Sequence, residues 1–303
     1  MHLTLRQLDV FEAVARHLSY TRAAAELHLT QPAISMQIKQ LEESLGLPLF
    51  EQIGKKIYLT DAGREMHHYS RSITQELTEA EAVLEDLKGL KRGRLSLAVA
   101  STANYFATRL LATFCQRYEN VAFTLDVTNR ERLLQHLEQN DIDLVIMGRP
   151  PDGLRLVAES FMENPLVLIA PPDHPLVGHR RIPLARLRQE RFLLRERASG
   201  TRTAMERFFT ERGVALASGM EMNSNEAIKQ AVHAGLGLGI VSLHTLPLEL
   251  RAGALATLDA EGFPIVRHWY VVYRQGKRLS PMAETFRQFV LSEARQLVAS
   301  GTA

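Results

Sequence analysis

The sequence contains little cysteine and little net charge. Cys115, the only cysteine among 303 residues, cannot form an internal disulfide, and the apolar helical pattern around it predicts a buried thiol in a reducing compartment. The 36 basic and 34 acidic residues leave a net charge of +2. The chain as a whole therefore has no strong attraction to nucleic acids or membranes.

Long apolar runs are missing as well. The longest uncharged stretch, residues 230–248, contains histidines, glycines and a proline, which make it a poor membrane span. The first residues are charged and amphipathic and show no export signal. We expect a cytoplasmic protein with no membrane partner.

Motifs of catalysis and metal binding are also lacking. The eleven histidines form no HExxH motif, and the sequence has no CxxC, GxSxG or Walker-type run. His67 and His68 are expected to be solvated on a helix. Gly235, Gly237 and Gly239 precede a predicted strand instead of following one, so they indicate a helix stop and close packing, not a dinucleotide fingerprint. We expect no enzyme activity, no metal and no bound cofactor.

The chain divides into three regions. Residues 1–60 predict short helices and a hairpin, residues 61–90 one long helix, and residues 91–303 an α/β domain. In the long helix, apolar or small residues recur at near-heptad spacing: Ala62, Met66, Tyr69, Ile73, Leu77, Ala80, Leu84 and Leu87. A stripe of this kind must be covered, which favours a homodimer. The alternative is a helix packed along its own second domain.

Strands alternate with helices beyond the linker around Gly93. Strands are predicted at 94–101, 121–127, 142–147, 166–170, 192–194, 220–222, 238–243 and 268–274. Helices are predicted at about 200–213 and 225–234 and from about Ser280. This alternation is typical of parallel sheets. It predicts two Rossmann-like α/β subdomains, one formed by 94–166 and 268–303 and the other by 167–267.

Residues 21–40 predict a helix-turn-helix. The first helix is rich in alanine, and the second, beginning at Pro32, has one buried apolar face and one polar face. A hairpin with Gly54, Lys55 and Lys56 at its tip follows and is suited to contact phosphates. Because residues 1–60 have no net charge, DNA binding would depend on local placement. Simple packing of two helices is the alternative.

The N-terminal motif resembles the winged helix-turn-helix of LysR-type transcriptional regulators. The resemblance is carried by Phe11, Ser19, Thr21, Ala23–Ala25, Leu27, Thr30–Ser35, Ile38, Leu41-Glu42, Gly46, Leu49-Phe50 and Leu59–Gly63. It implies an α/β fold class with an N-terminal all-α winged helix-turn-helix, a long dimerisation helix, and two subdomains of periplasmic-binding-protein type that hold an effector. Two positions depart from the usual pattern, because Glu51-Gln52 and Met36 stand where many members have basic residues.

Base edges and DNA phosphates would be contacted by different residues of this motif. Gln31 and Ser35 are expected to read bases, while Lys39 and the hairpin lysines contact the backbone. The predicted DNA-contacting residues are Ser19, Thr21, Arg22, Thr30, Gln31, Pro32, Ser35, Met36, Lys39, Lys55 and Lys56.

Further motifs resemble one branch of this family, the activators of Calvin-cycle, RuBisCO-encoding operons. They lie at 147–151, 199–209, 224–231, 262–264, 269–272 and 276–281. The resemblance implies a cytoplasmic regulator that binds double-stranded operator DNA as a homodimer or tetramer, with RNA polymerase as a further candidate partner. Phosphorylated metabolites such as ribulose 1,5-bisphosphate or phosphoenolpyruvate, or NADPH, are the implied effectors. The alternatives are a solute-binding module whose N-terminal helices only oligomerise, and a regulator of an unrelated operon.

Polar residues at the strand ends predict the effector site. Ligands of open α/β sheets bind beyond the carboxyl ends of the strands, where helices begin. Arginines and a lysine among these residues predict an anionic ligand, although each residue also has an ordinary explanation as a cap, a turn residue or an ion-pair partner. The predicted effector-binding residues are Ser101, Thr102, Asn104, Asn129, Arg149, Arg195, Ser199, Thr201, Arg202, Asn225 and Lys229.

Overall fold

The computed structural model of the chain describes residues 3–54, 56–87, 93–118, 121–215 and 219–299. Two compact units are present. The first comprises the residues up to Leu84 together with Gln139–Asp141, and the second comprises the remaining residues. The two units are described separately below.

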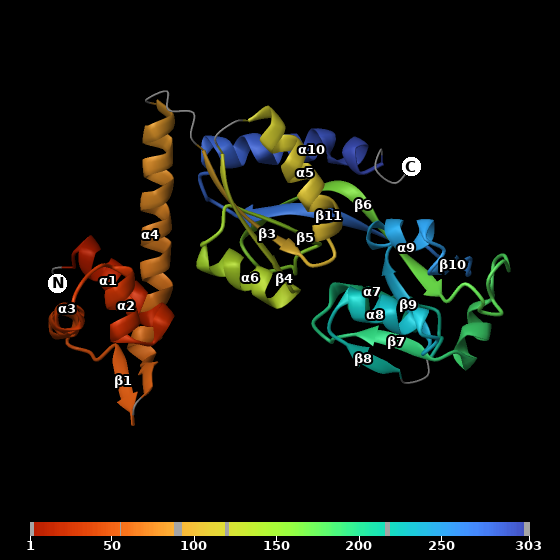
Figure 1. Cartoon of the computed structure of the whole chain (residues 1–303), viewed down its shortest axis with the longest axis horizontal. Coiled ribbons are helices and arrows are strands. Elements are labelled where there is room, and N and C mark those ends of the chain that lie inside the picture. Colours follow the sequence, from red (N-terminus) through yellow and green to blue (C-terminus); the bar gives the residue numbers. More distant parts are fainter. Residues whose placement is uncertain (1–2, 55, 88–92, 119–120, 216–218, 300–303) are drawn as a thin grey trace. The chain divides into compact units, whose positions relative to one another are not determined.

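Helices and a hairpin make up the first unit (Figure 1). Side chains at the helix starts fix the turns: Ser19 accepts a hydrogen bond from the Arg22 N–H, and Thr30 accepts one from the Ala33 N–H. The predicted helix-turn-helix is confirmed, with Pro32 as the second residue of its helix instead of the first. The elements are α1 (Leu5–His17), α2 (Tyr20–Glu26), α3 (Gln31–Leu45), β1 (Phe50–Ile53), β2 (Lys56–Leu59) and α4 (Asp61–Leu87).

The hairpin is attached to α3 by one carboxylate. Oε1 of Glu42 accepts hydrogen bonds from the backbone N–H groups of Leu49, at 2.8 Å, and Phe50, at 3.1 Å. Leu49 is buried in the same core as Ile34 and Ile38 of α3. This carboxylate therefore fixes where the hairpin begins relative to α3.

Among the stripe residues of α4 up to Leu84, only those near the beginning of the helix are covered, and the Leu87 side chain lies outside the described part. Ala62 and Met66 pack against the core of the first unit, whereas Tyr69, Ile73, Leu77 and Leu84 are exposed. His68 is exposed, but the expectation that His67 is solvated was wrong.

His67 is half-buried. It contacts the Glu12 carboxylate at 3.3 Å and lies edge-on to Phe11. Burial favours a raised pKa for Glu12, but hydrogen bonds from His67 and Ser70 outweigh it and hold that pKa below its usual value.

In the described part of the second unit, nine strands form one sheet in the order β4-β3-β5-β11-β6-β9-β7-β8, with β10 beside β6. Each end of the sheet is parallel, as expected, but β6 and β11 cross from one half to the other and pair antiparallel. The sheet is therefore mixed. The strands are β3 (Arg94–Ala100), β4 (Ala122–Thr128), β5 (Leu144–Gly148), β6 (Leu156–Ala170), β7 (Phe192–Arg195), β8 (Met220–Met222), β9 (Leu238–Ser242), β10 (Ala256–Leu258) and β11 (Ile265–Arg274).

Each half of the sheet has its own apolar cores, as expected for two α/β subdomains. Trp269, Phe106 and Phe286 belong to a core of the first half, and Phe192 and Phe208 to one of the second. The helices are α5 (Asn104–Arg117), α6 (Arg130–Gln139), α7 (Gly200–Glu211), α8 (Asn225–His233), α9 (Pro247–Arg251) and α10 (Pro281–Ala299), with 3-10 turns η1 (Leu184–Gln189) and η2 (Leu243–Thr245). The predicted class, a winged helix-turn-helix followed by α/β subdomains, is confirmed.

Two local predictions have different outcomes. A Cβ at Gly239 would lie 2.8 Å from Ile228, and Gly235 adopts a φ of +77° after α8, so these glycines do provide close packing and a helix stop. Cys115, in contrast, is exposed on α5 and not buried. In the described part of the chain, no helix is long and apolar enough to cross a membrane.

Replacing Glu42 should free the hairpin. In Glu42→Ala the two backbone N–H groups lose a charged acceptor, and we expect amide hydrogen exchange at Leu49 and Phe50 to accelerate about thirtyfold, equivalent to about 2 kcal/mol. The matched control is Glu43→Ala, whose carboxylate makes only an exposed contact with Lys39 at 3.9 Å. Equal exchange rates in the two variants would contradict this role of Glu42.

Candidate functional site

The exposed side of α3 carries most of the predicted DNA-contacting residues. Gln31, Pro32, Ser35, Met36 and Lys39 are all exposed on this helix. A polar helix surface of this kind fits the major groove of DNA.

The other predicted DNA contacts lie around this helix. Thr21, Arg22 and Lys56 are exposed, and Lys55 lies outside the described residues. Ser19 and Thr30 use their side-chain oxygens to cap helices. Ser19 and Thr30 therefore contribute to this surface by fixing where its helices begin.

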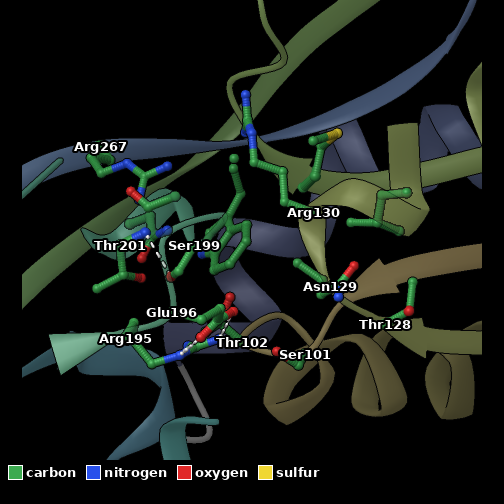
Figure 2. A pocket seen from close by; sticks show the side chains of 17 residues that line it. Ser101, Thr102, Thr128, Asn129, Arg130, Arg195, Glu196, Ser199, Thr201 and Arg267 are labelled. Atoms are coloured by element: carbon green, nitrogen blue, oxygen red, sulfur yellow. Dashed lines mark hydrogen bonds and ion pairs between the residues drawn. The ribbon is translucent and has the colours of Figure 1, made fainter. Parts of the chain in front are cut away.

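A pocket lies between the two halves of the sheet, where strands end and helices begin (Figure 2). Six of the predicted effector residues line it: Ser101, Thr102, Asn129, Arg195, Ser199 and Thr201. Ser101 and Thr102 follow β3, Asn129 follows β4, and Arg195 ends β7. Hydroxyl and amide groups from both subdomains thus face one space.

Two of these polar residues are also helix caps. Oδ1 of Asn129 accepts from the Arg132 N–H at 3.0 Å, and Oγ of Ser199 accepts from the Thr201 N–H at 3.2 Å. The capping and pocket roles are compatible, because a cap lies at the helix start, where unpaired N–H groups favour anions.

The predicted cationic lining needs correction. Arg195 lies in the pocket but forms two hydrogen bonds, at 2.8 and 2.9 Å, with the Glu196 carboxylate. Arg202 does not line the pocket and pairs with Glu206 and Glu221. Carboxylates of the chain therefore neutralise both arginines.

Lys229 is also neutralised within the chain. It is buried, and its Nζ lies 2.7 Å from Glu226 and 2.6 Å from Glu249. Burial alone would lower the pKa of Lys229, but hydrogen bonds with these two carboxylates raise it. Its charge is not available to a ligand in the pocket.

The remaining predicted residues do not line the pocket. Asn225 is buried and accepts a hydrogen bond from Arg195 at 2.6 Å. Asn104 begins α5, and its carbonyl accepts from the Thr108 hydroxyl. Arg149 lines a neighbouring basic pocket.

The positive charge of the pocket comes from Arg130 and Arg267, neither of which is among the predicted effector-binding residues. Arg267 lies on β11, and its Nη1 donates to the Gly200 carbonyl at 2.9 Å. Among the residues that the structure describes, no carboxylate pairs with it. Burial, together with the positive charges of Arg130 and Arg207, lowers the pKa of Arg267 to about 10.

Two glycines make room for the Arg267 guanidinium. A Cβ at Gly148 would lie 2.5 Å from its Nη2, and a Cβ at Gly200 would lie 3.1 Å from the same atom. The three residues come from β11, the end of β5 and the start of α7. The sequence therefore contained a signal for this site, because Gly148 and Gly200 lie at a strand end and at a helix start. The sequence did not show that Arg267 is the neighbour of both glycines.

The floor of the pocket contains the only tryptophan of the chain, Trp269. Its indole N–H donates to Nδ1 of His244 at 3.2 Å, and burial lowers the pKa of His244, which keeps the ring neutral as an acceptor. Asn164 also lines the pocket, and its buried Oδ1 has no hydrogen-bond partner among the described residues. Among the described residues, no group of histidine, cysteine and carboxylate side chains could hold a metal ion.

Comparison with known proteins identifies the family. Residues 5–64 match the bacterial regulatory helix-turn-helix proteins of the lysR family, and residues 88–295 match the LysR substrate binding domain. The chain belongs to the LysR family of transcriptional regulators. It is 63% identical over 297 residues to the "RuBisCO operon transcriptional regulator" of Allochromatium vinosum, covering 98% of both chains. It is thus a DNA-binding regulator by family and not an enzyme.

Solved structures of LysR-family proteins agree with this fold. The regulatory domain of Synechocystis CcmR in complex with 2-PG is 43% identical, with a TM-score of 0.64 over 66% of this chain and 97% of that domain. Full-length CbnR, crystallised with its target DNA, shares the fold with a TM-score of 0.72 at 23% identity, over 95% of this chain and 99% of that one.

The unpaired charge of Arg267 leads to a stability prediction. In Arg267→Met the half-buried guanidinium is removed without leaving an unpaired carboxylate, so the melting temperature of the ligand-free protein should be no lower than that of wild type. Arg287→Met is the contrasting control, because Arg287 is similarly covered but pairs with Glu159 and Glu284. Its melting temperature should fall. A larger fall for Arg267→Met than for Arg287→Met would contradict the assignment.

Proposed function

We propose that this LysR-family regulator controls a carbon-fixation operon that encodes RuBisCO, and that a small phosphorylated anion bound in the pocket beside Arg267 regulates it. The observation that carries the effector assignment is the half-buried Arg267 side chain, which lines the pocket together with hydroxyl and amide groups and has no carboxylate partner in the described chain. The similarity to the Allochromatium regulator supports the choice of operon.

The DNA partner is a two-fold related operator, bound by a dimer. Gln31 and Ser35 on the exposed side of α3 would contact base edges, while Lys39 and Lys56 would contact phosphates. The exposed apolar residues of α4, from Tyr69 to Leu84, would be covered by the same helix of a second copy. Assembly into a tetramer and contact with RNA polymerase stay predictions.

The effector acts on the two halves of the second unit. Ser101, Thr102 and Asn129 approach the pocket from one half, and Ser199 and Thr201 from the other. The halves are joined by β6 and β11, so a ligand that contacts both halves favours a closed arrangement over an open one. The ligand shifts this equilibrium only by its difference in affinity for the two states.

A phosphorylated ligand fits this chemistry. Phosphate accepts several hydrogen bonds, and the pocket offers hydroxyl donors, helix starts and, besides the Glu196-paired Arg195, the guanidinium groups of Arg130 and Arg267. The 2-PG bound to the regulatory domain of CcmR supports this class of ligand. Ribulose 1,5-bisphosphate, phosphoenolpyruvate and NADPH are further compounds for the binding assay.

Operator binding tests the DNA assignment. We expect the full-length protein to bind DNA upstream of the RuBisCO genes more tightly than random duplex, with an affinity that falls steeply with salt. Gln31→Ala should reduce the free energy of operator binding by about 1 to 3 kcal/mol and relax the preference for the operator sequence. Lys56→Ala should weaken binding to all DNA sequences equally and reduce the slope of log affinity against log salt concentration by about one. Fluorescence anisotropy measures the affinity, the sequence preference and the salt dependence. Equal affinity for the operator and for random duplex would refute specific binding.

Effector binding has a built-in reporter in Trp269. Titration of the full-length protein with 2-phosphoglycolate, the 2-PG of the CcmR complex, should change its tryptophan fluorescence and release or absorb heat in calorimetry. Arg267→Gln should weaken binding at least about tenfold, because a charged hydrogen-bond donor is lost. The control Arg186→Gln removes an exposed arginine on η1 that does not line the pocket. If neither 2-phosphoglycolate nor the other named anions bind, or if Arg267→Gln binds as wild type does, the effector assignment fails.

A further inference from the structure

Helices α5 and α8 make a direct contact between the two halves of the second unit. Tyr105 lies on α5, which packs in a core of the first half, and Glu226 and Lys229 lie on α8, which packs in a core of the second. The Tyr105 hydroxyl donates a hydrogen bond to Oε1 of Glu226, and Nζ of Lys229 lies 4.8 Å from the centre of the Tyr105 ring. None of these three side chains lines the effector pocket. A ligand in that pocket therefore leaves the contact intact.

Lys229 has a fixed position in this contact. Its side chain is only 3% exposed, and its Nζ lies 2.7 Å from Glu226, 2.6 Å from Glu249 and 3.1 Å from the Thr245 carbonyl. All three partners belong to the second half. The Tyr105 ring adds a covering from the first half, and the face of an aromatic ring attracts a cation. Separating the halves would remove this ring from the ammonium group.

The hydrogen bond from Tyr105 to Glu226 joins a protonated phenol to a charged carboxylate. Burial and the hydrogen bond to Glu226 raise the pKa of Tyr105 to about 12, so the hydroxyl stays a donor at neutral pH. Burial favours a raised pKa for Glu226, but hydrogen bonds from Lys229 and Tyr105 outweigh it and lower that pKa. Hydrogen bonds to a charged acceptor are stronger than those between neutral groups.

Both sides of the contact adjoin the effector pocket. Helix α5 begins directly after the pocket residues that follow β3, and Asn225 at the start of α8 accepts a hydrogen bond from the pocket residue Arg195 at 2.6 Å. Phe106, the neighbour of Tyr105, lies edge-on to His244 of the second half, with ring centroids 5.8 Å apart. The contact between α5 and α8 therefore influences how far apart the two sides of the pocket lie.

From this arrangement we propose that Tyr105, Glu226 and Lys229 form a latch that holds the two halves closed before the effector binds. Tyr105 is a positioning residue, because it raises the fraction of protein in the closed arrangement without contacting the ligand. An apparent dissociation constant equals the intrinsic one divided by that fraction, so loss of the latch weakens effector binding while every ligand contact is kept. The effect on the effector rests on the proposed function, but the latch itself is measurable without a ligand.

Pulsed electron paramagnetic resonance measures the separation of the halves. One spin label is attached at Gln135→Cys on α6 and the other at Thr210→Cys on α7, both exposed positions. Cys115→Ser removes the native thiol, which is the only one in the sequence and is exposed. The labelled full-length protein is mixed with an excess of unlabelled protein, so that the measured distance is the one within a single chain.

The ratio of closed to open protein should fall when the latch is weakened. In Tyr105→Phe the ring stays over Lys229 but the donor to Glu226 is lost, and we expect this ratio to fall about fivefold in the ligand-free protein. Tyr105→Ala removes both contacts and should lower the ratio further. The matched control is Tyr118→Phe, because Tyr118 is equally exposed at the other end of α5 and its ring packs on Phe114 of the first half.

Effector affinity gives a second readout in the same variants. In calorimetry with 2-phosphoglycolate, the dissociation constant should rise by the factor by which the closed fraction falls, since the pocket lining is unchanged. Saturating 2-phosphoglycolate should return Tyr105→Ala to the closed distance. Loss of stability alone would produce neither the proportional change nor this recovery.

Two results would overturn the inference. An unchanged distance distribution in Tyr105→Ala refutes the latch, whatever happens to the affinity, and an equal change in Tyr118→Phe shows that the effect does not come from the contact with α8. Circular dichroism checks folding, and Tyr105→Phe decides the question if Tyr105→Ala does not fold. If the distances change as expected but none of the named anions binds to wild type, the latch is supported and only the proposed effector fails.

Discussion

One half-buried guanidinium without a carboxylate partner among the described residues is the constraint on which the proposed effector site depends. Burying a charge is costly, and proteins usually balance it with an opposite charge. Arg287 and Lys229 follow that rule, since each contacts two glutamates. Arg267 instead has a backbone carbonyl and the positive neighbours Arg130 and Arg207. A negative charge supplied by a ligand would complete this environment.

The fold explains how this arrangement is maintained. Arg267 extends from β11, one of the two long strands that cross between the halves of the sheet, so its backbone is held by pairing with β6. The ends of β3, β4, β5 and β7 bring hydroxyl, amide and glycine residues to the same place. Because residues of both halves line the pocket, the proposed ligand would shift the arrangement of the halves to the extent that it binds one arrangement more tightly than another.

The sequence predicted features that depend on local spacing. The caps and the apolar periodicity of residues 19–45 were sufficient to predict the helix-turn-helix. Gly54 was sufficient to predict the turn of the hairpin. The rule that ligands bind beyond strand ends located six residues of the pocket, because this rule needs only the order of strands and helices. The full length of β6 was missed because only its buried end has a continuous apolar pattern, and β10 is too short to give a pattern.

Charge pairing could not be predicted in the same way. Arg202 and Lys229 appeared available for a ligand, yet Glu221 on β8 and Glu249 on α9 approach them only after the chain has folded. Arg267 preceded the predicted strand 268–274 and seemed to belong to a connection. The difference between a paired and an unpaired arginine depends on contacts between residues distant in sequence, so it became visible only in the structure.

The most direct test of this account is a crystal structure of the full-length protein grown with 2-phosphoglycolate. The account predicts an anion oxygen about 3 Å from the Arg267 guanidinium, with the two halves joined through contacts to Thr102 and Thr201. An anion bound elsewhere, with Arg267 paired to a carboxylate of the protein, would contradict it.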